Sequence, residues 1–158
     1  MKENMLTIRT VENIKRGSKI TLFNGLYAMV YGIISLCLMD IFIKRDFRDI
    51  SVVWQVFAKY NPEIANMLFR FIIIKSILII IVGIMIIALS NYILKKKDKT
   101  AWVTLFVTGL MFWGSLLTVD IMQGNLITII ISLVGWIMFI IGILLPVRYY
   151  LQRDYTEY

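Results

Sequence analysis

The chain has 158 residues, 59% of them hydrophobic, and a formal net charge of +7. The apolar residues come in blocks of about 20, the length that crosses a bilayer, which excludes an ordinary soluble domain. There is no histidine and Cys37 is the only cysteine, so an internal disulfide and any metal or haem site that needs histidine are excluded. The basic residues lie at the ends of the blocks, which favours topology signals and lipid headgroup contacts over nucleic-acid binding.

Residues 1–18 form a charged segment before the first apolar block. Apolar side chains recur in it at about helical spacing, at Met5, Ile8, Val11 and Ile14. Two interpretations stay open: a short amphipathic helix on the membrane surface, or a frayed polar tail. The long charged lead and the spanning length of the next block argue against a cleaved signal peptide.

The first predicted span covers residues 20–43. It carries small residues at steps of three and four, which let another helix approach closely: Gly25, Ala28, Gly32 and Ser35. Its polar side chains are Asn24, Tyr27, Tyr31 and Cys37. We expect these to pack in the core with local hydrogen bonds, and a ligand pocket among them is the alternative.

An outer segment, 44–68, follows the first span. Within 44–61, one helical face would hold the apolar residues: Phe47, Ile50, Val53, Trp54 and Phe57. The pattern predicts a short amphipathic helix in the membrane interface, with Trp54 at headgroup depth. A two-stranded hairpin is the alternative, but no Asn-Gly type turn supports it.

The second predicted helix begins at Pro62, because Asn61 can cap it and Glu63 lies in its first turn. It extends to about residue 94, and its membrane part covers 69–94. The first turns outside the hydrocarbon are expected to pack on the amphipathic helix through one face: Ile64, Met67 and Leu68.

One charge, Lys75, lies inside the apolar run of the second span. It is close enough to the outer boundary for its ammonium to reach the headgroups, and this interpretation comes first. An intramembrane charged pair with Asp40, near the outer end of the first span, comes second. A role in binding an anionic substrate or carrying protons comes third.

The third and fourth predicted spans cover 101–120 and 125–147, and Pro146 is a natural kink or end. The small residues predicted to form the helix-packing seams of spans two to four are Ser76, Gly83, Ser90, Thr104, Thr108, Ser115, Ser132, Gly135 and Gly142. On the third span Phe106, Trp113 and Asp120 fall on the face away from the seam. We expect that face to meet lipid, with Asp120 among the headgroups; contact with a second copy is the alternative.

The fold class predicted is an all-α membrane protein, a four-helix transmembrane bundle with left-handed packing, because small-residue seams with a 3-4 repeat recur on all four spans. The four-span domain covers 19–147 and a polar tail covers 148–158. The amino-terminal segment and the link 95–99 are rich in lysine and arginine, whereas the link 121–124 has none. Both termini are therefore predicted to be cytoplasmic.

Three basic residues of the outer segment run against this orientation: Lys44, Arg45 and Arg48. Asp46 and Asp49 lie among them and offset part of their charge. The heavy use of isoleucine and lysine points to the cell membrane of a prokaryote.

This layout is similar in outline to tetraspan families such as the claudins and the bacterial DoxX-like proteins. The resemblance is one of topology alone. The outer segment contains Trp54 but none of the cysteines of the claudin signature, and no functional residue is carried over from either family.

No phosphate loop, acid–base pair or nucleophile–base pair is visible in the sequence. Lys75 and Ser76 are adjacent, so on a helix their side chains diverge by about 100°. We therefore predict no catalytic, cofactor-binding or metal-binding residue, and expect a non-enzymatic accessory, regulatory or interaction subunit. Its expected partners are the lipid bilayer and either a second copy or a larger membrane protein.

Two other functions stay open. The first is a small oligomeric transporter or channel, in which Lys75 and Asp40 would line the pore. The second is a membrane enzyme that acts on a lipid or a quinone.

Overall fold

The computed structural model describes residues 2–49 and 53–152, and every element in these ranges is a helix. Four helical stretches are long and apolar enough to cross a membrane: Val11–Cys37, Pro62–Ile93, Lys99–Gln123 and Leu126–Leu144. The four predicted spans are therefore present, and the chain is a multi-pass membrane protein.

The amino-terminal segment is part of the first long helix, since α1 runs from Lys2 to Cys37 without a break. It is neither a separate surface helix nor a frayed tail over residues 2–18. The predicted end of the first span at residue 43 is wrong, because the helix is interrupted at Leu38 and α2 covers Met39–Asp49. Asp40 lies in the first turn of α2, where a negative charge complements the helix dipole.

The outer segment is divided between two helices, α2 and α3 (Trp54–Tyr60), rather than forming one. Residues 50–52 and the side chain of Phe47 lie outside the described residues. The Trp54 ring is buried, with its centroid 5.9 Å from the ring of Phe57 and 5.5 Å from the ring of Phe69. Val53, which was predicted on the same face, is exposed.

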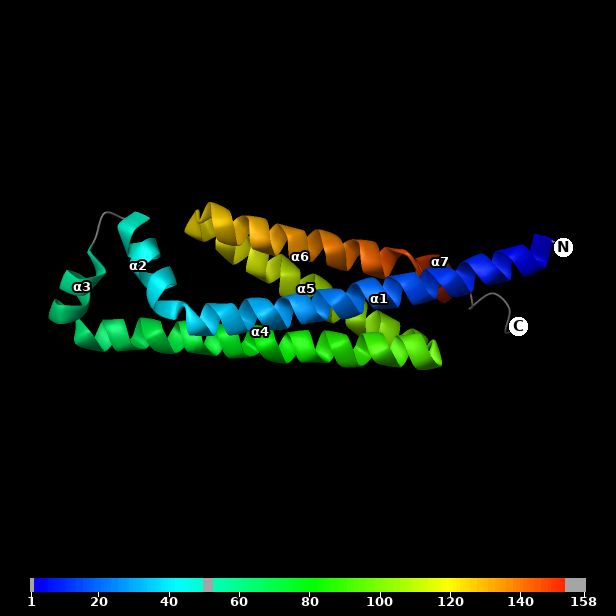
Figure 1. Ribbon diagram of the computed structural model, residues 1–158, viewed down its shortest axis with the longest axis horizontal. Coiled ribbons are helices and arrows are strands. Elements are labelled where there is room, and N and C mark those ends of the chain that lie inside the picture. The colour runs from blue at the N-terminus through cyan, green and yellow to red at the C-terminus, as the bar shows by residue number, and fades with distance from the viewer. Residues whose placement is uncertain (1, 50–52, 153–158) are drawn as a thin grey trace. The chain divides into compact units, whose positions relative to one another are not determined.

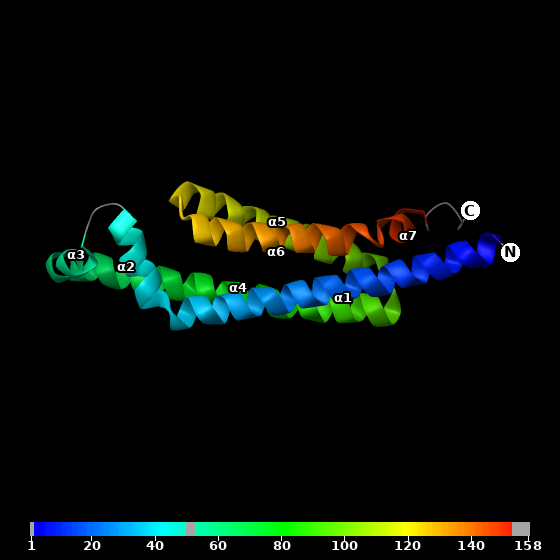
Figure 2. The ribbon, with the colours of Figure 1, turned by 45° about the horizontal axis from the view of Figure 1, so that its top comes forward.

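Helix α4 (Pro62–Lys96) begins at the predicted residue. The cluster around Trp54 and Ile43 includes Ala65 and Leu68 from its first turns. Ile64 and Met67 are about half exposed instead, so the packing face of these turns is rotated from the predicted one. Figure 2 shows α3 beside the first turns of α4.

The remaining helices are α5 (Lys99–Gln123), α6 (Leu126–Leu144) and the short α7 (Val147–Gln152). α5 and α6 lie side by side as a hairpin (Figure 1). Gly124 closes the hairpin with a φ of +69°, a conformation that favours glycine. Residues 145–146 separate α6 from α7, so Pro146, the predicted kink or end of the fourth span, lies in the link between them.

The chain divides into two compact units. One unit comprises the chain up to Tyr27 together with everything from Gly83 onward, so it holds the first part of α1, the last part of α4, and α5 to α7. The other comprises Ala28–Val82 and holds the rest of α1 and α4 with α2 and α3.

Candidate functional site

The first unit contains a network of buried polar side chains, centred on Asn24 of α1. Asn24 is fully buried, and its Nδ2 donates a hydrogen bond of 2.7 Å to the carbonyl of Gly135 on α6. Its Oδ1 accepts a 2.9 Å hydrogen bond from the indole Nε1 of Trp113 on α5. One amide thus bonds to two other helices, and its desolvation is offset by a partner on each side.

Shape explains why these three helices meet here. Trp113 is fully buried, and its ring occupies the space in which a Cβ on Gly135 would lie. Tyr27, with its ring centroid 6.0 Å from that of Trp113, donates a 3.0 Å hydrogen bond to the carbonyl of Ile131. One turn away along α5, Gly109 faces the ring of Phe139 in the same manner. Large rings therefore fill glycine notches on the facing helix.

Near the Gly124 turn, a second group of buried polar side chains includes a carboxylate. Asp120 of α5 is fully buried and accepts a hydrogen bond from the hydroxyl of Ser132 on α6. Asn125, also buried, caps the start of α6 by accepting a 3.2 Å hydrogen bond from the backbone N–H of Ile127. A buried carboxylate that bonds to another helix ties the hairpin together at this end.

At the other end of the first unit, hydroxyl groups link α1 to α4. The hydroxyl of Ser90 donates a 2.9 Å hydrogen bond to Thr21, whose own hydroxyl donates to the carbonyls of Gly17 and Ser18. Gly25 brings the same two helices close, because a Cβ there would lie 2.8 Å from the carbonyl oxygen of Gly83.

The second unit repeats this arrangement with other residues of the same helices. The hydroxyl of Ser76 on α4 lies 3.1 Å from that of Ser35 on α1 and donates to it. A Cβ on Gly32 would lie 2.9 Å from the carbonyl oxygen of Ser76. Both units thus join α1 to α4 through small residues and hydroxyls.

Most residues that the sequence assigned to the helix-packing seams lie on buried faces: Gly25, Ala28, Gly32, Ser35, Ser76, Gly83, Ser90, Ser132, Gly135 and Gly142. The seam residues of α5 do not lie on a buried face of the chain. Thr104 and Ser115 are exposed and Thr108 is half-buried. The buried residues of this helix include Trp113 and Asp120, which were expected to face lipid or a second copy.

The hydrogen-bonding groups explain why α5 is turned this way. A tryptophan N–H and a carboxylate cannot be satisfied by their own helix, so they need partners on another one. A serine or threonine hydroxyl can bond to a carbonyl one turn back. Ser115 donates to Phe112 at 2.9 Å and Thr118 donates to Gly114 at 2.8 Å, so these side chains can point outward without leaving a donor unpaired.

We call the outward side of this helix the outer face of α5. Its residues follow one another at steps of four and three: Thr104, Thr108, Met111, Ser115, Thr118 and Met122. Met122 is 81% exposed, the largest value among the exposed hydrophobic side chains. Beside this face, a Cβ on Gly114 would have no atom within 4 Å.

The predicted pair of Asp40 and Lys75 is not brought together. Asp40 is exposed on α2 and Lys75 is half-buried on α4. In the ranges 2–49 and 53–152, no ion pair joins the two side chains. The early end of α1 accounts for this placement, because it moves Asp40 from the predicted span onto the next helix.

The hydrogen bonds of these buried side chains join helices to one another. Their donors and acceptors bond to each other and to backbone carbonyls. Within the described part of the chain, no three acidic or cysteine side chains gather as metal ligands would.

Sequence reasoning missed the roles of Trp113 and Asp120. Two features of the sequence indicate these roles. Both side chains have groups that need a hydrogen-bond partner inside a membrane, and Gly135 on the facing helix leaves room for the Trp113 ring.

The chain matches no known protein-family model, and no characterised protein or solved structure shows significant similarity to it.

Proposed function

We propose that this chain acts by binding another membrane-spanning chain, as an accessory, regulatory or interaction subunit. The observation that carries the proposal is the outer face of α5, where small and hydroxyl-bearing side chains are exposed within a span. A surface that meets only lipid gains nothing from such residues, whereas helix–helix contacts in membranes are enriched in them.

The spacing and the hydrogen bonds of this face support the same function. Steps of four and three repeat every 3.5 residues on average, which keeps one face against a partner in left-handed packing. The hydroxyls of Ser115 and Thr118 are bonded to their own helix, so a partner covers them without stranding a donor. Met111 and Met122 add flexible side chains that adapt to a facing surface.

The proposal includes the packing of the spans, the membrane in which they lie and the side on which the termini lie. The four spans pack as a left-handed bundle in the cell membrane of a prokaryote, with both termini in the cytoplasm. The outer segment holds an amphipathic helix at the membrane interface. The lysines after α4 and in the amino-terminal segment support this orientation, since the link at Gly124 has no basic residue.

Ser115→Leu tests the proposal, because leucine would obstruct close approach of a partner helix. The wild-type chain, purified from its own membrane in mild detergent, is expected to have the mass of a complex with a second copy or another membrane protein. We expect Ser115→Leu to reduce that mass to one chain while the thermal midpoint of the chain is unchanged. Val134→Leu, at an exposed position of α6, is the matched control and should keep the complex.

Two results would contradict the proposal. One is a wild-type chain that is monomeric in mild detergent and in vesicles. The other is an ion flux in vesicles that Lys75→Met abolishes and Ser115→Leu does not. That flux would establish the transporter or channel instead.

A further inference from the structure

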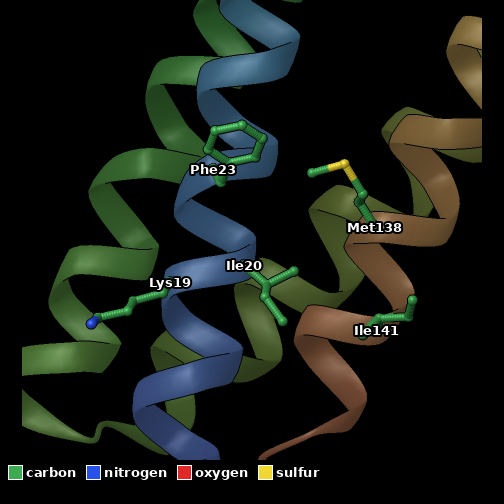
Figure 3. Close-up of a pocket in the computed structure, with 5 residues that line it drawn as sticks. All are labelled: Lys19, Ile20, Phe23, Met138 and Ile141. Carbon is green, nitrogen blue, oxygen red and sulfur yellow. The ribbon is translucent and has the colours of Figure 1, made fainter.

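A groove of about 380 Å³ opens between α1 and α6 in the first unit. Its walls are Ile20 and Phe23 on one helix and Met138 and Ile141 on the other (Figure 3). Phe23 and Ile141 are 59% and 49% exposed. The groove therefore opens sideways from two membrane-spanning helices, and its volume is in the range of about 300–1,000 Å³ found for ligand pockets.

Lys19 lines the same groove at the end where the apolar part of α1 begins. In Figure 3 its side chain extends from α1 away from the four apolar side chains, so its charge lies beside the groove and not in it. Within the described residues, Lys19 forms no ion pair. By contrast, Arg16, one turn earlier, is 2.6 Å from the carboxylate of Glu12.

The packing of α1 on α6 keeps this groove in place. A Cβ on Gly17 would lie 2.6 Å from the carbonyl oxygen of Gly142, and a Cβ on Gly142 would lie 2.7 Å from the side chain of Thr21. On the other side of the groove along α1, Asn24 bonds to Gly135. The two helices are thus fixed both before and after the residues that line it.

We propose that this groove binds one acyl chain of an anionic phospholipid, whose headgroup phosphate lies against the ammonium of Lys19. The apolar walls match the acyl chain, and the positive charge of Lys19 beside the groove matches the phosphate. A zwitterionic lipid should bind with lower affinity, because the cation of its headgroup is repelled by Lys19.

Quenching of a fluorophore by spin-labelled lipids tests this inference in vesicles of the full-length chain. Cys37→Ser removes the only cysteine, and Val134→Cys then places the fluorophore one helical turn from Met138. Doxyl-labelled phosphatidylglycerol should quench this fluorophore more strongly than doxyl-labelled phosphatidylcholine at the same mole fraction. Leu110→Cys, on α5 and outside the residues that line the groove, is the reference reporter, and the two lipids should quench it alike.

Charge and shape variants separate a bound lipid from general attraction to a basic surface. Lys19→Gln should lower the preference for phosphatidylglycerol roughly fivefold, the effect of one basic side chain near a headgroup. Lys15→Gln, which removes a neighbouring exposed charge outside the groove, should keep most of it, and Lys19→Arg should keep it fully. Ile141→Trp fills the groove without changing charge and should lower the preference as well.

The inference is overturned by any of three results. If the fluorophores at positions 134 and 110 show the same preference for phosphatidylglycerol, the lipid is attracted to the basic surface in general and not bound in the groove. An unchanged preference in Lys19→Gln removes the headgroup contact, and an unchanged preference in Ile141→Trp removes the groove. Since Lys19 and Ile141 are exposed, these variants should fold as the wild-type chain does, which circular dichroism checks.

Discussion

The packed and outer faces of α5 belong to one helix and differ in nearly every property. On the packed face, Trp113 and Asp120 are fully buried and bond to other helices. On the outer face, Met111 is 68% exposed and the hydroxyls of Ser115 and Thr118 bond to their own helix. On α5, a side chain whose hydrogen-bonding group has no partner in its own helix therefore faces the other helices, even when the side chain is as large as tryptophan.

The largest difference in the free energy of unfolding is expected when a large side chain is removed from each face. Trp113→Ala is expected to lower the free energy of unfolding by about 3–5 kcal/mol, because it leaves a cavity beside Gly135. It also removes the donor to Asn24. Met111→Ala, two residues away on the outer face, should change stability by about 0.5 kcal/mol or less. Unfolding in mixed detergent micelles, followed by circular dichroism, measures both.

If Trp113→Ala and Met111→Ala lower the free energy of unfolding equally, the assignment of the packed and outer faces is wrong. Trp113→Phe separates the two contributions, because phenylalanine keeps most of the ring volume and loses the N–H. Its cost should be smaller than that of Trp113→Ala but measurable, since the buried oxygen of Asn24 then loses a donor.

The glycines of α5 provide a second matched pair. A Cβ at Gly109 would collide with the ring of Phe139, whereas a Cβ at Gly114 meets nothing within 4 Å. Gly109→Ala should therefore destabilise the chain by about 1–3 kcal/mol through overpacking. Gly114→Ala should be neutral or stabilise it by up to about 1 kcal/mol, the helix propensity of alanine over glycine.

Thermal midpoints of the two glycine variants check this prediction. A loss of stability in Gly114→Ala with no oligomer present would show that the outer face is packed within one chain. An equal loss seen only in the oligomer would instead locate the partner helix beside Gly114.

The number of spans and the helix start at Pro62 follow from the sequence, because both depend on composition and on local backbone chemistry. The buried sides of α1, α4 and α6 also follow, since Gly25, Gly83 and Gly135 lie where another backbone or ring comes close. Another helix can come close only where the side chains are small, so a stripe of glycine or serine indicates the face on which it packs.

The orientation of α5 and the path of the outer segment could not be predicted in the same way. The stripe on α5 is as regular as the others, yet it faces outward, because Trp113 bonds to Asn24, 89 residues away on α1, and Asp120 bonds to Ser132 on α6, the other helix of the hairpin. The burial of Trp54 likewise depends on tertiary contacts with α4. A periodic pattern identifies a face but not the helix that covers it.

The same substitution on the two faces gives the smallest and most specific test. Ser132→Ala removes a hydroxyl donor from the buried Asp120 carboxylate, which should cost about 0.5–2 kcal/mol, the scale of hydrogen bonds between membrane helices. Ser115→Ala removes a hydroxyl bonded only to the carbonyl of Phe112 in its own helix, and should shift stability by no more than about 0.5 kcal/mol. The double variant of Ser132→Ala with Asp120→Leu, which has no acceptor, should cost less than the sum of the two single variants, because each single variant already removes the shared bond. Additive costs would mean that the hydroxyl and the carboxylate do not interact, and the difference between the two faces would then rest on packing alone.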